Sequence, residues 1–392
     1  MSEAFIIGAV RTAGGRRNGR LSGWHPVDLA ARLIDGLLER TDCDPALVED
    51  VIMGCVSQVA EQSTNVARNA VLASRLPVTV PGTSIDRQCG SSQQALHFAA
   101  QAVMSGVHDV VIAAGVESMS RVPMFTPSSL PQKNGMGSYM SPAVIERFRE
   151  NEFSQFTGAE MIARKYNLSR EALDEYALQS HQRAAQATEA GHFLDEILQV
   201  PVRTAEHGAT GEMHTADEGI RANATLEQIG SVKLLAEGGR ISAANASQIC
   251  DGASGVLIVN ERGLKAAGVK PLARIHHMSV LGDDPVMMLE APIPATQRAL
   301  KRAGMSIDDI DLYEVNEAFA SVPLAWIKAT GADPARVNAR GGAIALGHPL
   351  GASGTKLMAT LVHALRQRAA RYGLQTMCEG GGMANVTIVE RL

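Results

Sequence analysis

The chain has 392 residues, which is enough for two or three domains and a large buried interior. Its 36 basic and 41 acidic residues leave a net charge of −5, so no overall charge attracts a nucleic acid or an anionic membrane. Five cysteines, an odd number without a CxxC pair, argue against a disulfide framework and a structural zinc site. With neither a signal-peptide pattern nor a membrane-spanning stretch in the sequence, we expect a soluble cytoplasmic protein without a metal.

Short apolar runs alternate with segments of helical periodicity in the first and last thirds of the chain. This alternation favours an α/β architecture, in which parallel strands are joined by crossover helices. The predicted strands cover residues 3–9, 50–56, 109–114, 254–260, 272–281, 311–315, 374–378 and 384–390. The predicted helices cover residues 26–40, 89–105, 159–166, 169–190, 294–304 and 353–370.

The first and last thirds resemble two copies of one unit. Cys89 and Ala352 each stand at a predicted helix start, at corresponding distances after the end of a predicted strand. Gly115 and Cys378 follow them at equal separations, at or next to the end of a further predicted strand. If the two units form similar halves, their equivalent loops face a shared cleft.

The segment between these units has a different character, since it is rich in Met, Ser and Pro at its start and lacks strand alternation. We interpret it as an insertion that covers the cleft. The predicted organisation is therefore a first half of residues 1–118 plus 249–270, an inserted loop domain of residues 119–248, and a second half of residues 271–392.

The first motif that suggests chemistry is residues 86–94, a turn that runs directly into a predicted helix. Cys89 in this turn lies at or near a helix N-terminus, where unpaired N–H groups and the helix dipole favour a thiolate. We expect a lowered pKa for this thiol and a nucleophilic role. A small cysteine buried in the core is the alternative.

The second motif is residues 338–354, which place His348 between a glycine and a proline in a rigid turn. A histidine held in this way suits a general base, and the nearby glycines allow close approach of a ligand. A packed structural histidine is the alternative.

Two further motifs stand at predicted strand ends. In residues 376–383, Cys378 is followed by Glu379 and three glycines, whose N–H groups can point at a developing oxyanion. A structural tight turn would also explain these glycines. In residues 316–319, the amide side chain of Asn316 can hold a water or a carbonyl.

Together, and in this order, the four motifs resemble those of the thiolase family, and the resemblance covers essentially the whole chain. It implies the five-layer α/β/α/β/α thiolase fold, with two similar mixed-sheet halves and an inserted loop domain. It also implies an acyltransferase, an acetyl-CoA C-acyltransferase or C-acetyltransferase of fatty acid metabolism and β-oxidation. Such an enzyme cleaves 3-oxoacyl-CoA with CoA to acetyl-CoA and a shortened acyl-CoA, or runs the reverse Claisen condensation.

The resemblance assigns a role to each reactive residue. Cys89 accepts the acyl group in a ping-pong mechanism, His348 takes its proton, and Cys378 moves the proton at the α-carbon of acetyl-CoA. His348 and a water held by Asn316 form one oxyanion hole, and the backbone N–H groups of Cys89 and Gly380 form the other. This division agrees with the chemistry, because acyl transfer needs a nucleophile and the carbon acid needs a separate base.

The resemblance also implies contacts to the substrates, which are acyl-CoA and coenzyme A, with no permanently bound cofactor. Ser247 matches a contact to pantetheine, and Arg221 matches an arginine at the nucleotide end of coenzyme A, although a solvated arginine is equally consistent with the sequence. Met288 matches a residue of the acyl pocket, where a methionine of the core is the alternative. We expect a homodimer or a homotetramer that binds neither a nucleic acid nor a membrane.

Two departures from the family pattern concern the substrate. Phe156 and Thr157 stand where many short-chain biosynthetic members have His-Met, so the pocket near the thioester carbonyl is altered. Acetoacetyl-CoA is therefore not expected to be the preferred substrate. Ser92 replaces a common glycine soon after the nucleophile, at the start of the predicted helix.

Three other functions compete with this interpretation. A decarboxylating condensing enzyme of the ketosynthase type shares the fold but uses one cysteine with two histidines, and Cys378 argues against it. A catalytically silent acyl-CoA-binding protein on the same fold would not need all four motifs. A cysteine hydrolase would consume acyl-CoA without transferring the acyl group to CoA.

Overall fold

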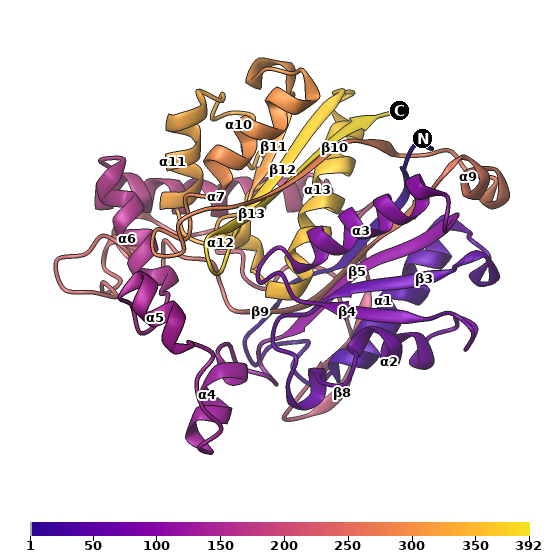
Figure 1. The fold of residues 1–392 in the computed structure, drawn as a ribbon, viewed down its shortest axis with the longest axis horizontal. Coiled ribbons are helices and arrows are strands. Elements are labelled where there is room, and N and C mark those ends of the chain that lie inside the picture. Colours follow the sequence, from indigo (N-terminus) through magenta and orange to yellow (C-terminus); the bar gives the residue numbers. More distant parts are fainter. Residues whose placement is uncertain (1) are drawn as a thin grey trace.

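The computed structural model describes residues 2–392, which form two groups of strands joined edge to edge (Figure 1). In spatial order, the first group contains β4 (Gly82–Ile85), β3 (Asp50–Gly54), β5 (Val110–Ser118), β9 (Cys250–Val259) and β1 (Phe5–Thr12). The second contains β11 (Leu312–Val315), β12 (Tyr372–Glu379), β13 (Met383–Arg391) and β10 (Ala273–Gly282).

The two groups share one topology. In the first, β3 runs parallel to β5, and β5, β9 and β1 follow as antiparallel neighbours. In the second, β11 runs parallel to β12, and β12, β13 and β10 follow in the same way. The groups meet where β1 pairs with β10 in antiparallel orientation. The similar spacing of the two sequence units thus corresponds to two copies of one strand arrangement.

Helices separate and cover the two strand groups, and together they make five layers (Figure 1). The central layer contains α3 (Ser91–Ser105) and α13 (Ser353–Gln367), which contact each other and both strand groups. On the outer faces lie α1 (Pro26–Thr41), α2 (Val66–Ala73), α10 (Pro292–Ala303) and α11 (Ser321–Thr330). The core between the strand groups therefore combines residues of α3 and α13, such as Leu96 and Met358, with strand residues such as Val111 and Ile258.

Small residues let the two helices of the central layer approach each other and β5 very closely at one end. A Cβ added to Gly354 at the start of α13 would lie 2.1 Å from the backbone nitrogen of Gln93 in α3. A Cβ added to Gly115 in β5 would lie 2.3 Å from the carbonyl oxygen of Gly351. Only glycine fits at such distances. The start of α3, the start of α13 and the ends of β3 and β5 are consequently pressed together.

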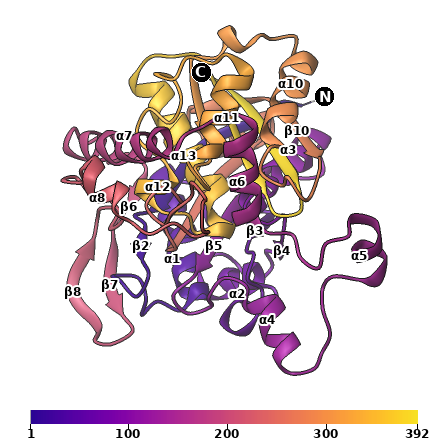
Figure 2. The same cartoon turned by 90° about the vertical axis from the view of Figure 1, so that its left-hand side faces the viewer.

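Each strand and helix predicted from periodicity is present, with bounds that differ by a few residues. Short elements were missed, among them α2, α11 and β4. The middle segment contributes α4 (Thr126–Lys133), α5 (Pro142–Phe148), α6 (Gln155–Lys165), α7 (Arg170–Glu189) and α8 (Leu226–Gly230). In Figure 2, α4 and α5 project from the body of the molecule.

The middle segment contains strands although its sequence lacks the alternation seen in the two halves. Its polar stretch forms an antiparallel hairpin of β7 (Val200–Thr204) and β8 (Gly208–His214), which extends beside the first half (Figure 2). Six of the seven residues of β8 are exposed. Strand β8 is held mainly by its backbone hydrogen bonds to β7, so it carries no alternation of apolar residues for a sequence to reveal, whereas Val200 and Val202 of β7 are buried.

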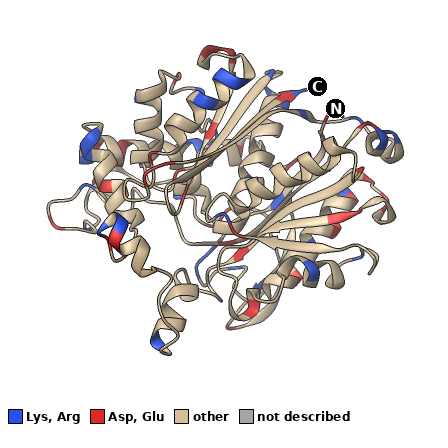
Figure 3. Ribbon diagram, in the orientation of Figure 1, with Lys and Arg blue, Asp and Glu red and all other residues tan. Residues whose placement is uncertain are grey.

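Charged residues of both signs are interspersed over the whole molecule (Figure 3). None of the helices in residues 2–392 combines the length and apolar character needed to cross a lipid bilayer.

Candidate active site

The four motifs converge where the central helices begin. Asn316 follows β11 and Cys378 lies at the end of β12, and these two strands are parallel neighbours. The backbone N–H of Asn316 donates to the carbonyl of Thr376 at 3.0 Å, which places the amide beside the end of β12. Because the carboxyl ends of parallel strands meet at one edge of a sheet, these two residues come together there.

The Cys89 turn packs directly against the loop that follows β12. A Cβ added to Gly90 would lie 2.0 Å from Oε1 of Glu379, and one added to Gly380 would lie 2.9 Å from Oε1 of Gln88. Gln88 has a left-handed backbone with φ of 49°. The structure thus brings Cys89 and Cys378, far apart in the sequence, to the same place.

Cys89 is mostly buried, two residues before the first residue of α3. Burial raises the pKa of its thiol to about 12, and the charge of Glu379 adds to this effect, while the backbone N–H of Cys89 opposes it. The expectation of a lowered pKa is therefore wrong. The helix terminus is too weak to offset both the loss of solvent and a nearby carboxylate.

His348 is held on three sides after α12 (Ala343–Leu346). Its backbone N–H donates to the carbonyl of Gln248 at 3.0 Å. Its Nδ1 lies 2.5 Å from Oγ of Ser353, whose hydroxyl donates to the carbonyl of Pro349 at 2.9 Å. Since the single hydroxyl proton of Ser353 is used there, Nδ1 of His348 carries the donated hydrogen and Nε2 keeps its lone pair.

The free nitrogen of His348 faces Asn316. Nε2 lies 3.4 Å from Nδ2 of Asn316, and burial, with a smaller effect from Lys356, lowers the pKa of His348 to about 3. His348 is therefore neutral and ready to accept a proton. A cavity of about 10 Å³, lined by Asn316, Gly347 and Ser353 among others, adjoins the pair. This volume is about that needed for one water molecule, and Asn316 and Ser353 give the mostly apolar lining a polar part.

Cys378 is buried at the end of β12, and burial followed by the charge of Cys89 raises the pKa of its thiol. A thiolate at Cys89 therefore disfavours a second thiolate at Cys378. In the following loop, Gly381 and Gly382 have φ of 82° and 75°, a conformation that suits glycine.

Ser247 lies beside the reactive residues. Its backbone N–H donates to the carbonyl of Ala318 at 2.9 Å, and its neighbour Gln248 holds His348. Arg221 is exposed, and its backbone N–H donates to Nδ1 of His181 at 3.2 Å. The structure therefore places Ser247 next to the site, whereas Arg221 lies on the surface of the middle segment.

Phe156 packs edge to face on Phe319, with ring centroids 5.8 Å apart, so it adjoins the Asn316 motif. Thr157 is exposed on α6, and Met288 is buried with a left-handed φ of 50°. A Cβ added to Gly158 would lie 3.5 Å from Cβ of Met288, so α6 and Met288 are in contact. These residues lie together on one side of the site.

Sequence reasoning missed two buried carboxylates that hold the loops of the site. Glu117 accepts the backbone N–H groups of Val56, Ser57 and Gly351 at 2.9–3.0 Å. Glu317 accepts from Ser180 at 2.7 Å and from the backbone N–H of Ile344 at 3.1 Å. A carboxylate directly at the end of an apolar strand is the signal that marks both.

Ser92 also has a defined role. Its Oγ accepts the backbone N–H of Thr355 at 3.0 Å, so it ties the first turn of α13 to α3. The replacement of glycine by serine at this position therefore links the Cys89 helix to the helix that follows His348.

Glu379 follows Cys378 in its motif, and the sequence predicts no role for it. It is fully buried, and neither carboxylate oxygen has a hydrogen-bond partner within residues 2–392. Burial, partly offset by the charge of Arg87, raises its pKa to about 8. The carboxyl group is therefore mostly neutral at pH 7 and becomes a charge beside Cys89 at higher pH.

This arrangement predicts slow alkylation of Cys89 by iodoacetamide at pH 7, with a rate that still rises above pH 9. Glu379→Gln removes a negative charge beside the thiol and is expected to shift the rate profile to lower pH. Peptide mass spectrometry at Cys89 measures the rate. A plateau below pH 8 in the unmodified protein, or an unchanged profile in Glu379→Gln, would contradict this account. Asp86 and Glu117, the other carboxylates acting on the thiol, remain in the variant.

Comparisons with known proteins agree over the full chain. The family models for the thiolase N-terminal and C-terminal domains match residues 4–262 and 269–391. A steroid 3-ketoacyl-CoA thiolase of Mycobacterium tuberculosis is 52% identical over 394 residues, covering 100% of this chain and 95% of the relative. A 3-ketoacyl-CoA thiolase of Bacillus subtilis is 38% identical, with both chains covered completely.

The solved structure of human mitochondrial 3-ketoacyl-CoA thiolase superposes with a TM-score of 0.88 at 35% identity. The match covers 100% of this chain and 99% of the human one, so the predicted thiolase fold is confirmed. With both family models matched, full-length relatives and one shared fold, the chain belongs to the thiolase family.

Proposed function

We propose that this acyltransferase cleaves 3-oxoacyl-CoA through an acyl thioester on Cys89, with His348 as the base and Cys378 as the acid at the α-carbon. The observation that carries the proposal is the orientation of His348. Ser353 holds Nδ1, and the unprotonated Nε2 is left for the reaction. A base must keep its lone pair directed at the group that it deprotonates.

In the proposed first half-reaction, the Cys89 sulfur attacks the 3-oxo carbon while its proton passes to Nε2 of His348. The C2–C3 bond then breaks, and the acyl group stays on Cys89. The acetyl-CoA carbanion takes a proton from Cys378. A thiol whose pKa is raised by burial suits this step, because it holds its proton until the strongly basic carbanion forms.

In the second half-reaction, the thiol of coenzyme A gives its proton to the Cys378 thiolate and attacks the acyl group. Cys89 leaves and regains the proton from His348, so both groups return to their starting state. Protonated His348 and a water on Asn316 stabilise one oxyanion, and the N–H groups of Cys89 and Gly380 stabilise the other. Within residues 2–392, Oδ1 of Asn316 has no hydrogen-bond partner, which supports its role in holding water.

Coenzyme A is the proposed substrate at Ser247 and Arg221. Ser247 is partly exposed beside His348, which suits a contact to pantetheine near the thioester. Arg221 is exposed on the middle segment, which suits an ion pair with a nucleotide phosphate. The enzyme carries out this transfer with coenzyme A as a substrate and needs no permanently bound cofactor in this scheme.

We propose that the enzyme prefers substrates with a large acyl group. Phe156 is 39% exposed although it packs on Phe319, and Met288 lies on the same side of the site. An exposed aromatic face beside the reactive groups offers apolar surface to a long or ring-bearing acyl chain. The 52% identity to a steroid 3-ketoacyl-CoA thiolase also supports a preference for a large acyl group.

We expect thiolysis of 3-oxooctanoyl-CoA and of a ring-bearing 3-oxoacyl-CoA to be at least as efficient as that of acetoacetyl-CoA. Steady-state kcat/KM across this panel measures the preference. Phe156→Ala should lower kcat/KM for the ring-bearing substrate more than for acetoacetyl-CoA. If acetoacetyl-CoA is preferred at least tenfold, a difference of about 1.4 kcal/mol, the proposed preference is wrong.

Self-association is proposed from two surface features. β4 ends the strand order of the first half, so one side of it is an open edge. Four large apolar side chains of residues 125–139 are exposed, namely Phe125, Leu130, Met136 and Tyr139. A homodimer or homotetramer would cover such surfaces, and sedimentation equilibrium distinguishes both from a monomer.

A further inference from the structure

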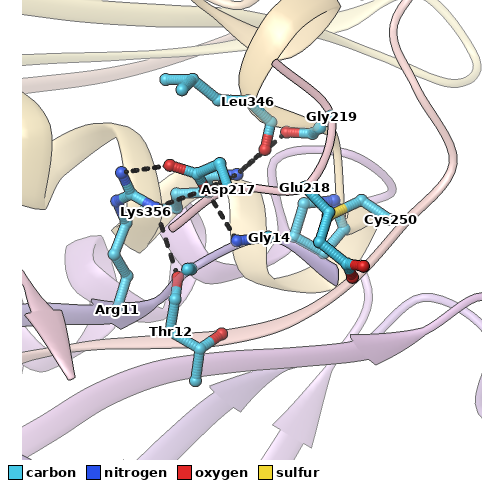
Figure 4. A network of polar contacts seen from close by, with 12 residues as sticks. Arg11, Thr12, Gly14, Asp217, Glu218, Gly219, Cys250, Leu346 and Lys356 are labelled. Carbon is cyan, nitrogen blue, oxygen red and sulfur yellow. Dashed lines mark hydrogen bonds and ion pairs between the residues drawn. The ribbon is translucent and has the colours of Figure 1, made fainter. Parts of the chain in front are cut away.

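The turn that carries His348 begins at the C-terminal end of α12, where the helix leaves carbonyl groups without intrahelical partners. The ammonium group of Lys356 reaches back from α13 and donates to two of them. Nζ lies 2.5 Å from the carbonyl oxygen of Leu346 and 3.1 Å from that of Gly347. Figure 4 shows Lys356 between Leu346 and Asp217.

Lys356 is 4% exposed, and a buried ammonium requires polar partners. Besides the two carbonyls, it faces Oδ1 of Asp217 at 3.9 Å. Asp217 is itself fixed, since it accepts from Nη1 and Nη2 of Arg11 at 2.8 and 3.0 Å and from the backbone N–H of Gly14 at 2.7 Å. Lys356 therefore has one defined position (Figure 4).

The turn has little freedom on its other side. Gly347 has φ of 81°, and a Cβ added there would lie 2.6 Å from Sγ of Cys250. The side chain of Gln248 donates to the carbonyls of Ile344 and Gly219 at 2.6 and 2.8 Å, while the backbone carbonyl of Gln248 accepts from the backbone N–H of His348. The contacts from Gln248 are made by neutral groups, whereas the hydrogen bonds from Lys356 to the turn come from a charged ammonium group.

We propose that Lys356 is a positioning residue for His348, because its two hydrogen bonds to Leu346 and Gly347 fix the turn from which the imidazole projects. This inference deepens the proposed function and rests on the role of His348 as the base. Through Asp217, the same contacts tie the turn to the middle segment that carries Arg221.

Removal of the ammonium should loosen the turn without unfolding the protein. In Lys356→Met, a side chain of similar length fills the space, and Asp217 keeps Arg11 and Gly14 as partners. Only the carbonyls of Leu346 and Gly347 lose a donor. A displacement of about 1 Å in a reacting group can cost on the order of 10²-fold in rate. His348 should stay neutral in the variant, since burial is the larger cause of its lowered pKa.

The test compares Lys356→Met, Lys356→Arg and Lys301→Met in the full-length enzyme with acetoacetyl-CoA and coenzyme A. Lys301 is an exposed lysine of α10 and controls for the substitution itself. We expect kcat to fall at least tenfold in Lys356→Met, with KM for both substrates within about threefold of the unmodified enzyme. Lys356→Arg, which keeps a cationic donor, should recover most of kcat, and Lys301→Met should be unchanged.

Circular dichroism and thermal unfolding show whether each variant is folded. A folded Lys356→Met enzyme with kcat within twofold of the unmodified enzyme would overturn the inference, as would an equal loss in Lys356→Arg. His348→Asn separates this outcome from failure of the proposed function. If His348→Asn is inactive while Lys356→Met is active, only the role of Lys356 is wrong, whereas an active His348→Asn would remove the base on which it depends.

Discussion

Cys89→Ala is expected to abolish thiolysis of 3-oxoacyl-CoA and the exchange of acetyl groups between acetyl-CoA and a coenzyme A analogue. Both reactions pass through an acyl group on this sulfur, so the loss should be on the order of 10⁴-fold or more. Rates of the two reactions measure it. Peptide mass spectrometry after a rapid quench should find the acyl adduct on Cys89 in the unmodified enzyme.

Cys43→Ala is the matched control, because Cys43 is also a largely buried thiol but lies in the loop after α1, outside the site. It should keep both activities. An adduct on Cys378 with Cys89 free, or substantial exchange by Cys89→Ala, would show that Cys89 is not the nucleophile.

Cys378→Ala is expected to separate the two reactions. Acetyl exchange creates no carbanion and should persist, whereas thiolysis and Claisen condensation should fall by about 10²–10⁴-fold, the usual contribution of a positioned acid or base. The exchange rate and the thiolysis rate on one preparation measure the separation. The variant replaces a buried side chain by a smaller one, so thermal unfolding must accompany the kinetics.

Two results would show that this division of labour is wrong. One is condensation by Cys378→Ala at a rate near that of the unmodified enzyme. The other is loss of acetyl exchange as complete as in Cys89→Ala while the protein stays folded. The first result would show that Cys378 does not carry out the proton transfer. The second would show that Cys378 takes part in acyl transfer.

The titration states give these predictions their chemical basis. Burial raises the pKa of the Cys89 thiol to about 12 and lowers that of His348 to about 3, so the resting pair is neutral. Proton transfer must then accompany the attack of sulfur on the substrate, rather than precede it as a stable ion pair. A bound substrate that places its oxygen near the N–H groups of the site supplies the compensating stabilisation.

The sequence by itself determined the elements and the reactive residues. Its periodicity predicted the long strands and helices because each buries one face against the core, and four motifs in order pointed to the thiolase chemistry. Short elements such as β4, and the exposed strand β8, left no such pattern. Their formation depends on backbone pairing and on neighbours distant in the chain.

Only the tertiary structure decided the electrostatics and the supports of the site. The position of Cys89 near a helix start predicted an acidic thiol, but the pKa depends on burial and on Glu379, which is distant in the sequence. Likewise, nothing local to Lys356 shows that it donates to Leu346 and Gly347 or faces Asp217. Such effects arise from charges and carbonyls that meet only after folding, because burial strengthens each of these interactions and no linear motif records it.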